Sequence, residues 1–119
     1  MAAPNLKNPT TITGKTVRYA VTASLASVLA NGAASGKALK INSIFCANVD
    51  GTSAADISVT IYNGTTDFYL AKTIVVPADA TQIISTKETY FYLEEGDSIR
   101  AVANEASDLE LIIGYEDIS

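Results

Sequence analysis

The chain has 119 residues, a formal net charge of −5 and no histidine. A chain of this length fits one domain of ordinary size and is too short for two independent cores. Its eight basic residues are scattered and do not form the clustered Lys/Arg patch that phosphate binding needs, so we expect no nucleic acid partner.

The first residues indicate an extended arm, because Pro4 and Pro9 each remove a backbone donor and exclude the segment from a sheet interior. Such an arm is either disordered or laid across a partner. We expect residues 1–13 to form the arm and residues 14–119 to form a single β-sandwich domain. The candidate partner-binding residues of the arm are Pro4, Asn5, Leu6, Lys7 and Pro9.

The first strand is predicted from Thr16 onward, where Val17, Tyr19 and Val21 alternate with more polar residues. Residues 24–30 fit either a strand or a short helix, and the pattern does not decide between them. The stretch from Tyr19 to Gly36 is uncharged but diluted by serine, threonine and asparagine, so we expect no membrane-spanning helix.

The segment 37–48 predicts a longer strand in which Leu39, Ile41 and Phe45 share one face and Ile44 and Cys46 share the other. Because there is one cysteine, no internal disulfide is possible. Its place in an apolar strand favours a small buried side chain over a reactive thiol.

Residues 56–62 alternate strictly, with Ile57, Val59 and Ile61 directed inward, and Asn63-Gly64 follows at once. This pair predicts a hairpin with a type I′ turn, after which residues 68–76 pair back antiparallel. Shorter strands are predicted at 82–85, 90–93, 98–103 and 109–115. In the last of them the residues from Leu109 to Tyr115 at odd positions share one face, and Glu110, Ile112 and Gly114 share the other. About eight short strands without a helical pattern indicate an all-β protein, an antiparallel β-sandwich or jelly-roll-like fold.

The candidate chemistry is sparse. Without histidine the chain cannot form a Ser-His-Asp triad or a typical zinc site. Glu94, Glu95 and Asp97 surround Gly96, and they fit a solvated turn better than a glycosidase pair or a calcium site. We therefore expect no catalytic residue, metal or cofactor, and no enzymatic activity.

The tyrosines are the other candidate site residues. Consecutive aromatic residues in a strand point to opposite faces, so some of Tyr62, Tyr69, Tyr90 and Tyr92 should lie outside the core. They could form cross-strand pairs that stabilise the sheet, a protein interface, or a platform for stacking sugars.

Several segments resemble small virion structural proteins of tailed bacteriophages, especially phages of marine bacteria and cyanobacteria. The segments are 36–44 (GKALKINSI), 48–56 (NVDGTSAAD), 92–100 (YLEEGDSIR) and 115–117 (YED), and the resemblance spans about residues 14–117. It implies a particle component and supplies no catalytic residue.

Within that class the resemblance implies a capsid decoration or cement subunit, made in the host cytoplasm and bound to the capsid surface of the virion. The implied partners are the major capsid protein or other virion proteins and further copies of this chain, with a trimer suiting a threefold capsid position. The alternatives are a neck, tail or fibre-associated virion protein and a carbohydrate-binding attachment module. We expect no membrane partner.

Overall fold

The computed structural model describes residues 3–119 and is almost entirely β-structure. The strands are β1 (Ile12–Ala20), β2 (Ala26–Ala30), β3 (Ala38–Asn48), β4 (Ala55–Tyr62), β5 (Asp67–Val76), β6 (Thr81–Ser85), β7 (Phe91–Leu93), β8 (Ser98–Ala103) and β9 (Leu109–Ile118), with a short 3-10 helix η1 (Lys87–Thr89) before β7. Residues 26–30 thus form a strand, which decides between the strand and the helix that the sequence left open for residues 24–30.

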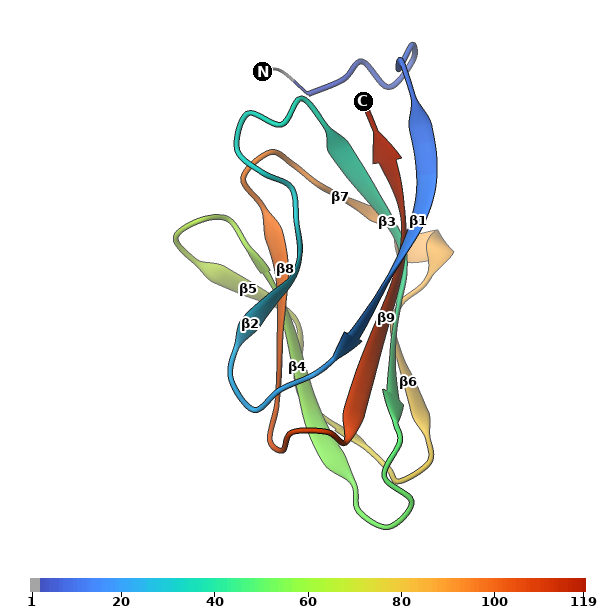
Figure 1. Cartoon of the computed structure of the whole chain (residues 1–119), viewed down its shortest axis with the longest axis vertical. Coiled ribbons are helices and arrows are strands. Elements are labelled where there is room, and N and C mark those ends of the chain that lie inside the picture. The colour runs from blue at the N-terminus through green and yellow to red at the C-terminus, as the bar shows by residue number, and fades with distance from the viewer. Residues whose placement is uncertain (1–2) are drawn as a thin grey trace.

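Two antiparallel sheets face each other, as Figure 1 shows. Sheet A has the order β1-β9-β3-β6, with β7 pairing with the same edge of β3 as part of that sheet, and sheet B has the order β2-β8-β4-β5. This confirms the predicted antiparallel β-sandwich, and the strand order is that of a jelly roll.

The chain runs as one long hairpin rolled up on itself. Ile12 pairs with Ile118 at the open end of the hairpin, and Tyr62 pairs with Asp67 at its tip. Between these limits β2 pairs with β8, and β3 pairs with β6 and β7. Rolling then adds the pairs β3–β9 and β4–β8, which close the two sheets.

The tip of the hairpin differs from the predicted two-residue type I′ turn. Four residues, 63–66, join the strands, and only Gly64 among them has a positive φ, of 99°. The Asn63 side chain explains the difference, because its Oδ1 accepts hydrogen bonds from the backbone N–H groups of Thr65 and Thr66. That local bonding favours a wider turn.

The core lies between the two sheets. Eight of its largest fully buried side chains come from five strands: Ile41, Ile44, Ile57, Leu93, Ile99, Leu109, Leu111 and Ile113. Most of them occupy the alternating positions that the sequence predicts, in particular Ile57 and Val59 of β4 and Leu109 to Ile113 of β9.

Strand β3 departs from its predicted alternation. The register against β9 shifts between Ile41 and Ser43, so one extra residue enters β3 at a bulge. Leu39 and Ile41 therefore face the core before the bulge, and Ile44 faces it afterwards. Phe45, predicted to share the face of Leu39 and Ile41, lies outside the sandwich instead.

Candidate interaction surface

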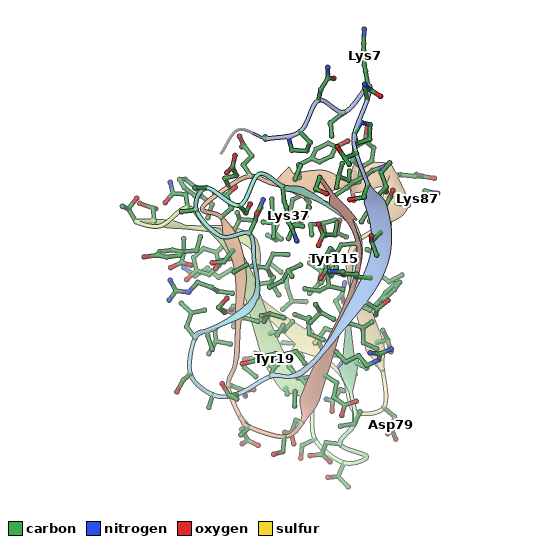
Figure 2. The ribbon with its side chains drawn as sticks, turned by 45° about the horizontal axis from the view of Figure 1, so that its top comes forward. Lys7, Tyr19, Lys37, Asp79, Lys87 and Tyr115 are labelled. Carbon is green, nitrogen blue, oxygen red and sulfur yellow. The ribbon has the colours of Figure 1, made fainter. Side chains whose placement is uncertain are left out.

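The predicted residues of the N-terminal arm precede the first residue of β1. The Asn5 side-chain Oδ1 accepts a hydrogen bond from the backbone N–H of Lys7, and the carbonyl oxygen of Asn5 accepts one from the N–H of Asn8. This turn leaves Leu6 half-exposed and places Lys7 at the tip of the segment, far from Asp79 at the other end of the molecule (Figure 2). The division of the chain at residue 13 stays a prediction, with β1 beginning at Ile12.

The four candidate tyrosines fall on both sheets. Tyr90 and Tyr92 lie at β7 on sheet A, where their rings meet edge to face with centroids 5.9 Å apart. Lys40 Nζ sits 4.4 Å from the centroid of the Tyr90 ring. Tyr62 and Tyr69 belong to sheet B, where they pair in register with Asp67 and Thr60, respectively. The structure therefore brings Tyr90 and Tyr92 together but does not gather the four tyrosines into one platform.

Tyr62 belongs to a polar cluster on the outer side of sheet B. The Arg100 guanidinium lies 4.3 Å from the centroid of its ring, and an Arg100 nitrogen lies 3.4 Å from a carboxylate oxygen of Asp67. Thr60 donates a hydrogen bond of 2.7 Å to the same carboxylate group and is fully buried although it faces away from the core. These contacts stabilise the tip of the hairpin and occupy the Tyr62 ring.

Tyr69 belongs to a larger exposed surface on β5. This strand is an edge of sheet B and pairs only with β4 within residues 3–119. Its exposed apolar side chains, which we call the β5 edge, are Phe68, Tyr69, Leu70, Ile74 and Val75. Phe68 and Val75 are 59% and 58% exposed. Consecutive side chains of this strand point to opposite faces of the sheet, so the five flank its open edge on both sides. An exposed apolar edge strand is a surface on which another chain can pair.

A second apolar surface lies on the outer face of sheet A. Phe45 of β3 pairs in register with Ile83 of β6 on one side and with Ile112 of β9 on the other. The three side chains, which we call the apolar row, are 37%, 52% and 40% exposed, respectively. Alternation along β9 places Ile112 outside, but only the bulge in β3 places Phe45 beside it.

Opposite charges flank the apolar row. Arg18 of β1 pairs in register with Ile112, and Glu110 lies two residues before Ile112 on β9. Both side chains are exposed, and neither has an ion-pair partner within residues 3–119. Arg18, Glu110 and Ile112 also line a shallow hollow of about 330 Å³ that is completed by Tyr19, Ala20 and Leu111.

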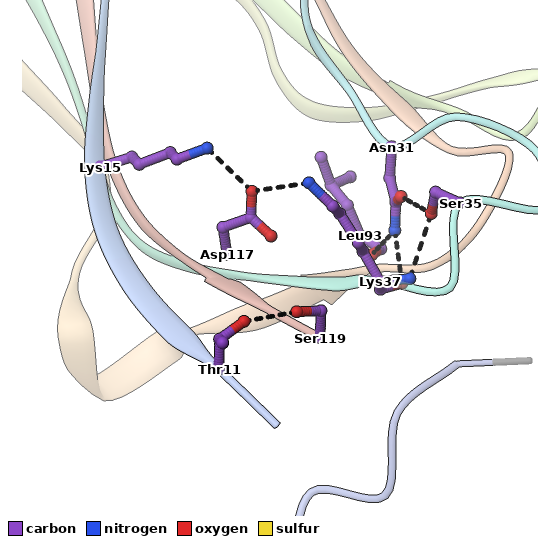
Figure 3. A network of polar contacts seen from close by, with 8 residues as sticks. All are labelled: Thr11, Lys15, Asn31, Ser35, Lys37, Leu93, Asp117 and Ser119. Atoms are coloured by element: carbon purple, nitrogen blue, oxygen red, sulfur yellow. Dashed lines mark hydrogen bonds and ion pairs between the residues drawn. The ribbon is translucent and has the colours of Figure 1, made fainter. Parts of the chain in front are cut away.

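A polar cluster closes the opposite end of sheet A, between the sheets (Figure 3). Asp117 Oδ2 accepts hydrogen bonds from Lys15 Nζ at 3.0 Å and from Lys37 Nζ at 3.2 Å. Burial alone would raise the pKa of Asp117, but the hydrogen bonds and charges of the two lysines together hold its pKa below the usual value. The two lysines thus keep the Asp117 carboxylate ionised in the folded protein.

Asn31 fixes the loop that carries Lys37. Its side-chain Nδ2 donates to the carbonyl oxygens of Lys37 and Leu93, each at 2.9 Å, and its Oδ1 accepts a hydrogen bond from the Ser35 hydroxyl (Figure 3). Because Asn31 is itself buried, these bonds hold the loop against β7. The cluster is therefore a structural support for this end of the sandwich.

The acidic residues around Gly96 also stabilise a turn. Asp97 Oδ2 accepts a hydrogen bond from the backbone N–H of Glu94, and Glu95 Oε2 accepts one from the N–H of Gly36. Glu95 thereby ties the turn to the loop before β3. Among residues 3–119 no group of three or more histidine, cysteine, aspartate or glutamate side chains could hold a metal ion.

Cys46 is fully buried in the core, as its strand pattern predicts. Burial raises the pKa of its thiol to about 11, which disfavours the reactive thiolate. Within residues 3–119 no helix is long and apolar enough to cross a membrane.

No protein-family model and no curated protein sequence matches this chain. Among solved structures it is similar to a protein of Bacillus endospore appendages, which form disulfide-linked pili. The identity is 14% over 92% of this chain and 87% of that chain, with a TM-score of 0.54.

Two structures of a pentameric capsid protein isolated from metagenomic phage sequences are also similar to this chain. Their identities are 19% and 20%, and their TM-scores are 0.41 and 0.40. This chain is covered over 85% in both comparisons, and it spans 63% and 59% of the capsid chains. The likeness to the appendage protein, at 14% identity, establishes a shared two-sheet fold.

Proposed function

We propose that this protein is a non-enzymatic structural subunit of a tailed-phage particle, bound to the capsid surface as a decoration or cement subunit. The observation that carries the proposal is the β5 edge, where five large apolar side chains of one strand stay in water. Covering such a surface with a partner removes apolar area from water and favours association. The resemblance of residues 36–44, 48–56 and 92–100 to phage virion proteins supports the choice of partner.

In this proposal the β5 edge docks on the major capsid protein, and the N-terminal segment around Leu6 and Lys7 adds a second contact. Two contacts on one rigid domain strengthen binding through their high effective concentration. Three copies would suit a threefold position of the capsid. The alternative is a position at the neck, the tail or a fibre of the same particle. A protein at any of these places could also cover the β5 edge.

The test is to band particles from phage-producing cells in a density gradient and to detect the protein by mass spectrometry. We expect it in complete particles and also in tailless capsids, which separates a capsid position from the neck, tail and fibre alternatives. Phe68→Ser should release it from the particles, whereas the matched control Val49→Ser, an exposed apolar residue of a loop, should not. Detection only as free protein in the lysate would exclude a particle subunit.

A carbohydrate-binding role is the second candidate function, because the Tyr90 and Tyr92 rings are partly exposed side by side on sheet A. The planes of the two rings are 88° apart, so a sugar could stack on the face of one ring but not on both rings at once. A glycan array with the wild-type protein and Tyr90→Ala tests this role. Binding to a defined glycan that is lost in the variant would favour it over the capsid role.

A further inference from the structure

The outer face of sheet A combines an apolar row with charges of both signs. The apolar row crosses three neighbouring strands, and beside it lie a cation, Arg18, and an anion, Glu110, neither of which has an ion-pair partner among residues 3–119. A surface that pairs with a copy of itself needs both partners of each ion pair on the same face. This face has both.

The register fixes where these side chains lie relative to one another. Neighbouring strands are about 4.8 Å apart, and two residues along a strand span about 6.6 Å. On this grid, Arg18, Ile112 and Phe45 lie on one line across the strands, and Glu110 lies one step below Ile112. Consider a twofold axis that lies in the plane of the face, oblique to the strands, and that crosses this line between Ile112 and Phe45. Rotation about this axis brings Arg18 of one copy over Glu110 of the other.

We infer that the outer face of sheet A is a twofold interface between two copies of this chain. The axis brings Phe45 and Ile112 of each copy next to the same residues of the other and places Arg18 of each copy opposite Glu110 of the other. Apolar side chains thus lie at the centre of the interface with ion pairs at its rim, the arrangement found in stable protein interfaces. The strands of the two copies cross at about 70°, near the orthogonal class of sheet packing.

The part of the face next to the row leaves room for the partner. Two residues further along, β9 carries Gly114 and β3 carries Ser43, so the surface there is low. A Cβ atom added to Gly114 would lie 3.1 Å from the Ser43 hydroxyl oxygen. The twofold axis places Ile83 of the second copy over this low region, where it can pack without displacing a larger side chain.

The size of the face predicts a weak dimer. Strands β1, β3 and β9 have 9, 11 and 10 residues, and β6 and β7 add 5 and 3 along the far edge of β3. Together they make a face on the order of 600 Å² in projection. Standard interfaces bury about 800 Å² on each partner. We therefore expect association that depends on protein concentration and that exists independently of any phage particle.

The test measures the mass of the purified protein by sedimentation velocity over a wide range of concentration. The wild type should form a dimer. Arg18→Glu and Glu110→Arg should each weaken the dimer about tenfold or more, because each places like charges opposite each other across the interface. The double variant restores the opposite charges and should dimerise again, whereas Lys72→Glu on sheet B should change nothing.

Phe45→Ser removes the centre of the interface and should also abolish the dimer. A protein that stays monomeric at every concentration, or whose dimer survives both single charge reversals, would overturn the inference. So would a double variant that fails to recover. Because Phe68→Ser tests particle binding through the β5 edge, loss of particle binding and loss of the dimer are separate results, and either proposal can fail alone.

Discussion

At the scale of single residues, Asp117 shows how a charge is kept at the edge of the core. Its side chain is only 10% exposed, and two lysines bind the same oxygen. Neither lysine is close to Asp117 in sequence, so the cluster could not be predicted before β1, β9 and the loop before β3 were placed together. Alternation along β9 predicts that Asp117 faces inward and that Glu116 does not. It does not predict which side chains bind Asp117.

Asp117→Asn should lower the free energy of unfolding by about 1 kcal/mol at neutral pH, because a neutral amide oxygen accepts from the two half-exposed lysines more weakly than the carboxylate does. Since the folded-state pKa of Asp117 is below the ordinary value of 3.8, its contribution is complete above that value. The contribution is lost as the pH falls through the lowered pKa. Urea denaturation of both proteins at neutral pH and in strong acid should show a difference only at neutral pH.

Thr73 adopts a backbone conformation that costs free energy. It has a φ of 53° within β5, and a β-branched residue rarely adopts this left-handed conformation. Its backbone N–H donates to the Ser58 hydroxyl oxygen, a bond that does not depend on the threonine side chain. Thr73→Asn should therefore raise the free energy of unfolding by about 1 kcal/mol, because asparagine tolerates this region. Thermal denaturation measures the change, with Thr65→Asn as a loop control; an unchanged or lower melting temperature would contradict this account.

At the scale of elements, the bulge in β3 decides which residues face the core. Period-two alternation predicts the strand but not the position of an inserted residue, which depends on how β3 pairs with β9. For the same reason the sequence predicts the orientation of Ile112 correctly and that of Phe45 wrongly. The apolar row could not be predicted, because it combines residues of three strands whose order is set by the rolling of the hairpin.

Two substitutions at neighbouring positions test the register of β3. Ile44→Ala should lower the free energy of unfolding by about 2–5 kcal/mol, because it leaves a cavity in the core. Phe45→Ala should lower it by less than about 1 kcal/mol, because that ring is already outside the core. Chemical denaturation gives both values. A larger loss for Phe45→Ala than for Ile44→Ala would place the bulge elsewhere.

At the scale of the whole molecule, the sandwich is elongated, with principal extents of 48 × 27 × 19 Å, and its ends differ in charge. The loops after β3, β5 and β8 meet at one end (Figure 1). The charged residues in and beside them are all acidic, namely Asp50, Asp56, Asp79, Glu105, Asp108 and Glu110. Toward the other end lie Lys7, Lys37 and Lys87 (Figure 2). Asp117, which binds Lys15 and Lys37, and Glu95, which binds the N–H of Gly36, lie at this end too. One end of the sandwich is therefore uniformly acidic, and the other end carries charges of both signs.

The N-terminal segment and the sandwich should separate in stability experiments. Removing residues 1–8 should leave the melting temperature unchanged, because no hydrogen bond joins residues 3–8 to the strands. Removing residues 1–11 should lower it, because the N–H groups of Thr10 and Thr11 donate to the carbonyl oxygen of Ser119. Differential scanning calorimetry of the two truncated proteins checks this. Equal melting temperatures for both would show that the pairing beyond β1 contributes nothing.

The rolled hairpin brings Thr11 and Ser119 side by side, although 107 residues separate them along the chain. The chain can therefore be closed into a ring by a short linker between these positions and opened at Gly64, in the exposed tip between β4 and β5. Such a circular permutant keeps every strand pair, but the contacts that were nearest in sequence at the tip become the most distant. The ring lacks residues 1–10 and with them the segment around Leu6 and Lys7, but it keeps the β5 edge and the outer face of sheet A, so it presents these two surfaces without the arm.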